Sequence, residues 1–178
     1  MESNIESLAV APDQTHAFDF KAVFHDQYPR VVRLISRIVN DPGRSEDIAV
    51  EVFLKLWQTA KAHGENVNGW LYRTAIRMSL DGLRRRNRRE KYEKFFGLPR
   101  AAPTPEQLHS EGQRQQRVRV VLSVMKPRLA ELLLLRSDGV SYQELAQILE
   151  LNPVSVGTLL SRAQKTFRKE YIKRYGPE

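Results

Sequence analysis

Apolar residues near the start of the chain recur with the spacing of one helical face, i, i+3, i+4, i+7, and predict a core helix. The stripe consists of Val31, Leu34, Ile35, Ile38 and Val39. Pro29 stands just before it, where proline favours the first position of a helix, so a separate short helix is expected over residues 18–28. Asp41-Pro42-Gly43 interrupts the pattern, and Ser45 is expected to cap the helix that follows.

The next two helices are expected on either side of a polar loop over residues 62–68. The first directs Ile48, Val52 and Leu56 to one side. The second is expected to start near Gly69, and its inward residues are Ile76, Leu80 and Leu83. It continues into a run of cations opposed only by two glutamates, which comprises Arg84, Arg85, Arg86, Arg88, Arg89, Lys91 and Lys94.

Regular structure is expected to break between Phe95 and Pro105, where glycine and proline are frequent. Thr104 with Pro105 then marks a new helix start, and Gln107 completes a capping box. The pattern therefore predicts an all-α fold of two small helical domains, residues 15–94 and 105–174, joined by a flexible linker over residues 95–104.

The second predicted domain ends in a helix-turn-helix. After the apolar helix expected over residues 128–137, Ser141 and Glu144 form a capping box that opens a short helix. Asn152 and Pro153 open the last helix, which turns Val156, Leu160 and other apolar residues inward and many cations outward. A short helix, a tight turn and a longer basic helix are typical of DNA-binding units.

Charge and composition narrow the classes of function. The 178 residues carry a formal net charge of +8, which favours a polyanionic partner, either nucleic acid or an acidic membrane surface. The chain shows neither an apolar run of the roughly 20 residues that span a bilayer nor the features of a signal peptide, so we expect a cytoplasmic protein without membrane contact. With zero cysteines and four scattered histidines, we expect no metal site, no cofactor, no catalytic residue and no enzymatic activity.

Two blocks of sequence carry motifs that can be compared with known families. The string from Ser45 to Trp57, SEDIAVEVFLKLW, resembles region 2.2 of the sigma-70 family of RNA polymerase subunits, and GWLYRTA from Gly69, followed by Asp81, Leu83 and Arg84, resembles regions 2.3 and 2.4 of the same family. GVSYQELA from Gly139, with its flanking residues, resembles region 4. With these two domains and a tether, the chain is similar to the extracytoplasmic-function group.

The resemblance implies an initiation factor that takes core RNA polymerase to promoters and assists promoter melting. Its partners would be the clamp helices of the largest polymerase subunit, the flap region, promoter DNA and an anti-sigma factor, with the chain itself a monomer. The resemblance implies these polymerase-binding residues: Asp47, Glu51, Phe53 and Trp57. From the residues alone, both aromatic side chains also fit a core position.

The same resemblance assigns two DNA interfaces. The minus-ten element would contact His63, Asn66, Asn68, Trp70, Arg73, Arg77, Arg84 and Arg85. Helical spacing places several of these arginines along one stripe, while Trp70 also fits a packing role. The minus-thirty-five element would contact Ser155, Thr158, Ser161, Arg162 and Lys165, with Arg162 the candidate for guanine.

Three positions depart from the family pattern. Members often carry asparagine at the position of Arg77, so we carry over no base contact there. They frequently carry basic residues at the positions of Gly157 and Leu159, so we expect fewer direct contacts to DNA from this helix. Two other functions are considered. A free-standing helix-turn-helix regulator does not need the helix ending at Trp57, and an RNA-binding adaptor that uses the arginine run leaves the helix-turn-helix unexplained.

Overall fold

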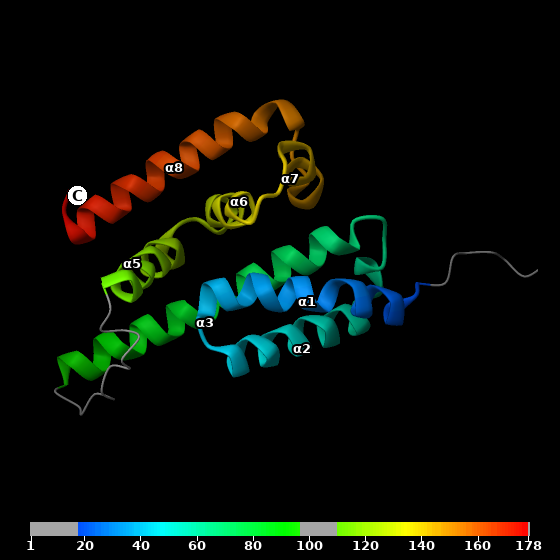
Figure 1. The fold of residues 1–178 in the computed structure, drawn as a ribbon, viewed down its shortest axis with the longest axis horizontal. Helices are drawn as coiled ribbons and strands as arrows, with labels where there is room; N and C mark the ends of the chain where they lie inside the picture. Colours follow the sequence, from blue (N-terminus) through cyan, green and yellow to red (C-terminus); the bar gives the residue numbers. More distant parts are fainter. Residues whose placement is uncertain (1–17, 97–109, 178) are drawn as a thin grey trace, which may run out of the picture.

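The computed structural model describes residues 18–96 and 110–177, and within these ranges the regular structure is entirely helical. We call residues 18–96 the N-terminal block and residues 110–177 the C-terminal block. Figure 1 shows the two blocks stacked, with the long helix α3 between α1 and α2 on one side and the later helices on the other. In chain order the elements are α1 (Phe20–Val39), α2 (Pro42–Gln58), the 3-10 helix η1 (Ala60–Ala62), α3 (Val67–Phe95), α5 (Ser110–Val124), α6 (Pro127–Ser137), α7 (Tyr142–Leu149) and α8 (Pro153–Tyr175). The all-α architecture expected from the pattern is confirmed.

Helix α1 corrects the prediction of two helices divided at Pro29, because it runs through this residue without a break. A proline inside a helix costs about 3 kcal/mol, since it removes a backbone hydrogen bond and crowds the preceding turn. Both halves of α1 pack on the same core, which opposes this cost. Phe24 and Tyr28 in the first half contact the ring of Phe53, and Val31 in the second half is fully buried.

The start of α2 also differs from the prediction that Ser45 caps it. The helix begins at Pro42, and Asp41 is the cap, with its Oδ1 accepting a hydrogen bond from the Arg44 amide at 3.0 Å. Ser45 lies inside the first turn, where its buried hydroxyl donates to the Asp41 carbonyl at 2.6 Å. Proline suits the first position of a helix, so the acceptor directly before it becomes the cap.

The first hydrophobic core lies among α1, α2 and the beginning of α3. Its buried members are Val31, Ile35, Val39, Ala49, Val52, Phe53, Leu56, Ala62, Leu71 and Ala75. One polar pair is enclosed at its edge. The hydroxyl of Tyr72 donates to Oε1 of Gln27 at 2.8 Å, and Gln27 is only 3% exposed.

In the C-terminal block the observed helix boundaries follow local signals. The capping box at Ser141 is confirmed, since its Oγ accepts from the Glu144 amide at 3.2 Å and its own amide donates to Glu144 Oε2 at 2.8 Å. Asn152 caps α8 through the amide of Val154, with Pro153 at the first position. Gly139 has a φ of 85°, which permits the turn between α6 and α7.

The second core crosses from one block to the other. It contains buried leucines, valines and alanines of α5 to α8, and also Leu34 and Ile38 of α1 and Ile76, Leu80 and Leu83 of α3. Helix α3 accordingly contacts α5, α6 and α7 as well as α1 and α2. Helix α3 therefore contributes buried residues to both cores.

Most of the predicted linker, from residue 97 to 104, lies outside the described residues, as do the predicted cap at Thr104 and the first residues of both predicted domains. Within the described ranges, no helix combines the length and apolar composition that crossing a bilayer requires.

Replacing Tyr72 by phenylalanine is expected to lower the free energy of unfolding by about 1 to 3 kcal/mol, because the buried amide oxygen of Gln27 loses its donor. Denaturant unfolding followed by circular dichroism measures this loss. Tyr92→Phe removes a hydroxyl from an exposed side chain and serves as the matched control. Equal stability of both variants would contradict a structural role for this hydrogen bond.

Candidate functional site

The outer surface of α2 is apolar although it faces solvent. Val50, Leu54 and Trp57 recur at i, i+4 and i+7, and the exposed fraction of Trp57 reaches 64%. Asp47 and Glu51 lie beside them and are exposed as well. We call these five residues the outer α2 face. An apolar strip with an acidic rim, left uncovered on a helix that buries its other side, is typical of a protein-binding surface.

The structure separates the two aromatic residues that were predicted to bind polymerase. Phe53 points into the first core and is 2% exposed, so it takes the core position that the residues alone also allowed and offers no surface to a partner in this arrangement. The rings of Phe20 and Phe24 pack edge-on against it, so it supports the fold beneath the outer α2 face. Val50 and Leu54 also lie on this face, although the sequence-based assignment of polymerase-binding residues did not include them. The sequence does indicate them, because they form a second apolar stripe on the side of α2 opposite Val52 and Leu56.

The predicted minus-ten residues just before α3 and in its first turn occupy different environments. His63 is partly buried, with its ring stacked on Phe18 at a centroid distance of 3.9 Å and its Nε2 2.8 Å from the Leu56 carbonyl oxygen. Trp70 is half-buried against the first core, and Asn68 is exposed. His63 is thus held by internal contacts, whereas Asn68 remains open to a partner.

The predicted arginine stripe of α3 faces the C-terminal block. Arg73 Nη2 lies 2.8 Å from Glu150 Oε1, and Arg73 Nη1 donates to the carbonyl of Ile148. Arg77 Nε donates to Glu131 Oε1 at 2.7 Å. Helical spacing thus brings these two side chains together as predicted, and both have partners within the chain.

Arg84 and Asn66 contact the same block at the two ends of the stripe. The Nε of Arg84 donates to the Ser123 carbonyl at 2.6 Å, and Asn66 Nδ2 donates to the Gln147 carbonyl at 2.9 Å. Arg85 lies to one side of the stripe and is exposed. The predicted minus-ten residues are therefore divided among two exposed residues, Asn68 and Arg85, two that pack within the N-terminal block, His63 and Trp70, and a group bound to the C-terminal block.

The contact with Arg73 changes the pKa of Glu150. Hydrogen bonding to this guanidinium, followed by its positive charge, lowers the pKa of Glu150 below the ordinary value for glutamic acid. Because the pKa is lowered in the contact, the interaction is present at neutral pH and is lost as the pH falls through that lowered pKa.

The outer surface of α8 carries all of the predicted minus-thirty-five residues. Ser155, Thr158, Ser161, Arg162 and Lys165 are exposed. Several of them line a shallow depression together with Lys169. Among the described residues, neither Arg162 nor Lys165 forms a salt bridge, so both cations are available to an external anion. The inner side of the helix buries Val156, Leu160 and Ala163 in the second core.

The two departures from the family pattern in α8 have different structural settings. Leu159 is partly buried and packs against the second core, so it is directed away from a ligand on the outer surface. Gly157 borders the depression, and an added Cβ would meet only the Tyr142 ring, at 3.7 Å. Space therefore exists at this position, but the glycine offers no side chain for DNA.

Two family models match the chain, in the order that the motifs predict. The model of Sigma-70 region 2 matches residues 23–89, and the model of Sigma-70, region 4, matches residues 115–166. The first covers α2 and nearly all of α1 and α3, and the second covers most of the helices from α5 to α8.

The chain is also similar to curated sigma factors and to a solved structure. It is 27% identical over 174 residues to the extracytoplasmic-function (ECF) sigma factor SigK of Mycolicibacterium vanbaalenii, covering 94% of this chain and 89% of the relative. It is 26% identical to the ECF sigma factor SigE of Mycolicibacterium smegmatis, covering 84% of this chain but only 60% of that protein. The solved structure of the sigma factor RpoE in complex with the anti-sigma factor NepR from Bartonella quintana shares the fold, with a TM-score of 0.50, 20% identity, and coverage of 86% of this chain and 97% of that one. With both regional models matched in sequence order, the chain belongs to the sigma-70 family of RNA polymerase sigma factors, in its extracytoplasmic-function group.

Proposed function

We propose that this protein binds core RNA polymerase, directs it to specific promoters and assists promoter melting. The single observation that carries the proposal is the pair of uncovered surfaces in the two matched regions. The outer α2 face is apolar with an acidic rim, and the outer surface of α8 is polar and cationic. The first suits a protein partner and the second suits the phosphates and base edges of duplex DNA.

Within this proposal each surface has one partner. The outer α2 face contacts the clamp helices of the largest polymerase subunit through Val50, Leu54 and Trp57, and Phe53 supports it from below. The C-terminal block meets the flap region and places α8 in the major groove of the minus-thirty-five element. Asn68, Trp70 and the arginines of α3 contact the minus-ten element.

The remaining assignments follow from this function. Residues 15–94 and 105–174 act as the two functional domains, and residues 95–104 act as the tether. Such a subunit positions polymerase and DNA and has no reaction of its own, so we propose no catalytic role. Because its partners are polymerase and promoter DNA, we place the protein in the cytoplasm.

An anti-sigma partner is a further proposal, supported by the fold shared with the RpoE structure, in which that protein is bound to NepR. A free-standing helix-turn-helix regulator remains the alternative function. It does not require the uncovered outer α2 face, so polymerase binding discriminates between the two functions.

Run-off transcription tests the main proposal directly. Purified core polymerase with this protein is expected to initiate on a subset of a promoter-fragment library, whereas core polymerase alone is not. Co-purification with core enzyme is expected in the same preparation. The sigma function is wrong if no promoter responds and the chain fails to co-purify.

Leu54→Asp is expected to weaken binding to core polymerase by at least roughly tenfold, because it places a charge in the middle of the apolar strip. The side chain is exposed, so folding should be unaffected. Affinity is measured with labelled protein and purified core enzyme. Tyr92→Asp, which also replaces an exposed apolar side chain by aspartate but lies near the end of α3, should leave the affinity unchanged. A loss of similar size in both variants would argue against a specific surface.

Arg162→Ala is expected to reduce use of promoters that depend on the upstream element by about 1 to 3 kcal/mol, the discrimination of one bidentate base contact. Binding to core polymerase should persist, because the side chain lies on the outer surface of α8. Arg30→Ala removes the same charge from an exposed position of α1 and serves as the control. Loss of core binding in the Arg162 variant would contradict this division of roles.

A further inference from the structure

The C-terminal block presents a row of negative groups to the arginine stripe of α3. Arg73 meets the end of α7, where it binds the carbonyl of Ile148 and the carboxylate of Glu150. The last carbonyls of a helix lack partners within the helix and attract cations. Arg73 is well covered in this position, since its side chain is 14% exposed.

A second helix end receives Arg84 in the same way. Its guanidinium donates to the Ser123 carbonyl at 2.6 Å and to the Met125 carbonyl at 3.4 Å, at the end of α5. Nearby, Asn87 Nδ2 donates to Ser123 Oγ at 3.1 Å. These contacts satisfy the final carbonyls of α5 with a cation from the other block.

Between the two helix ends, Glu131 of α6 accepts from Arg77 at 2.7 Å. The Glu131 side chain is fully buried, and its Oε2 has no hydrogen-bond partner among the described residues. Arg128 Nη1 lies 3.9 Å from this oxygen. A buried carboxylate depends strongly on the cation that meets it, so Arg77 stabilises Glu131 only while the two blocks remain together.

This row has the chemistry of a nucleic-acid backbone. Along α3, the row consists of the end of α7 with the Glu150 carboxylate, then the buried Glu131 carboxylate, and then the end of α5. A DNA strand would offer phosphates to the same guanidiniums. Since each arginine has one set of donors, the C-terminal block and DNA cannot use the stripe at the same time.

Apolar packing holds the row in place. Ile76, Leu80 and Leu83 of α3 belong to the same core as the leucines of α5 and α6. Opening the blocks would expose this surface to water and free the arginines together. The contact therefore behaves as one unit.

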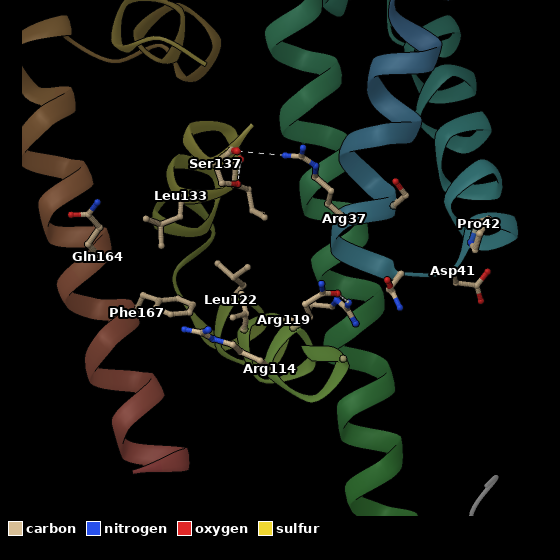
Figure 2. Close-up of a pocket in the computed structure, with 16 residues that line it drawn as sticks. Arg37, Asp41, Pro42, Arg114, Arg119, Leu122, Leu133, Ser137, Gln164 and Phe167 are labelled. Atoms are coloured by element: carbon tan, nitrogen blue, oxygen red, sulfur yellow. Dashed lines mark hydrogen bonds between the residues drawn. The ribbon is translucent and has the colours of Figure 1, made fainter. Parts of the chain in front are cut away.

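Other features of the interface oppose the closed arrangement. Burial, and secondarily the nearby positive charge of Arg86 on α3, lowers the pKa of Arg119 on α5, so the charged form of Arg119 is destabilised in this arrangement. A cleft of about 1100 Å³ also remains between α1 and the C-terminal block, as Figure 2 shows. The interface is thus incompletely packed. One set of contacts across the cleft favours closure: Arg37 Nη1 donates to the Ser137 carbonyl, and the Asp138 carboxylate lies 2.7 Å from the same nitrogen.

We propose that in the free protein the C-terminal block acts as an internal substitute for DNA. It occupies the arginine stripe of α3 and keeps the two blocks in contact, the closed arrangement, until polymerase and promoter replace it. This inference rests on the proposed function. It gives Arg73, Arg77 and Arg84 two successive partners, first the C-terminal block and then the DNA strand.

Energy transfer between two dyes measures closure without polymerase. The chain has zero cysteines, so Lys61→Cys and Lys173→Cys, both at exposed positions, introduce one label in each block. Glu131→Gln and Asp138→Arg are expected to lower the transfer efficiency. The double variant Arg37→Asp with Asp138→Arg is expected to restore it, because the ion pair is rebuilt in reverse.

Glu170→Gln is the matched control. It makes the same change in charge as Glu131→Gln, but its partner Arg174 lies within α8, so closure should be unaffected. Circular dichroism verifies that each variant is folded. Unchanged transfer in folded Glu131→Gln and Asp138→Arg variants would overturn the proposal.

Run-off transcription separates this proposal from the proposed function. At limiting protein, Glu131→Gln is expected to raise initiation by roughly threefold to tenfold over the unsubstituted chain, and Glu170→Gln is not. If the unsubstituted chain initiates transcription but Glu131→Gln does not increase initiation, the proposal of an internal substitute for DNA is wrong and the sigma function is retained. Opening of the labelled variants without initiation by any form would defeat the sigma function and leave the closed contact standing.

Discussion

The packing of α3 on two sides is the constraint on which the rest of the structure depends. Leu71 and Ala75 belong to the core shared with α1 and α2, whereas Ile76, Leu80 and Leu83 belong to the core shared with the C-terminal block. A helix with two apolar sides has only a narrow surface left for polar residues. The arginines occupy this surface, and so they lie at the border of the second core. Their position beside the C-terminal block follows first from the packing of α3, and the ion pairs with Glu131 and Glu150 add to it.

The outer α2 face and the outer surface of α8 also belong to helices that bury one side and expose the other. Helix α2 buries Val52 and Leu56 and leaves Val50, Leu54 and Trp57 in solvent, while α8 buries Val156 and Leu160 and leaves Arg162 and Lys165 in solvent. In each case the packed inner face already orders the backbone of the helix, so only the exposed side chains have to be ordered on binding. A factor that must hold polymerase and DNA in fixed relation benefits from surfaces on helices of this kind.

In the closed arrangement these surfaces are not equivalent. The outer α2 face and the outer surface of α8 are open, whereas the stripe of α3 is bound to the C-terminal block through Glu131, Glu150 and two helix ends. Under the proposed function, duplex binding by α8 and polymerase binding by α2 need no rearrangement of these surfaces, whereas capture of a DNA strand by α3 requires release of the C-terminal block. Under our proposal this difference would order the steps of initiation, with docking before melting.

The sequence by itself determined the local features and the family. Several features depend only on residues close together in the chain and could therefore be predicted from it. They are the caps at Ser141 and Asn152, the end of α3 near the glycine- and proline-rich segment, and the order of the two motif blocks. Only the tertiary structure decided that α1 continues through Pro29, that Phe53 is buried while Trp57 is exposed, and that the arginines of α3 meet the C-terminal block. Those outcomes depend on partners far away in sequence, as in the pair of Arg77 and Glu131, 54 residues apart. Helical periodicity shows that a face is apolar or charged, but it carries no information about which distant surface will cover that face.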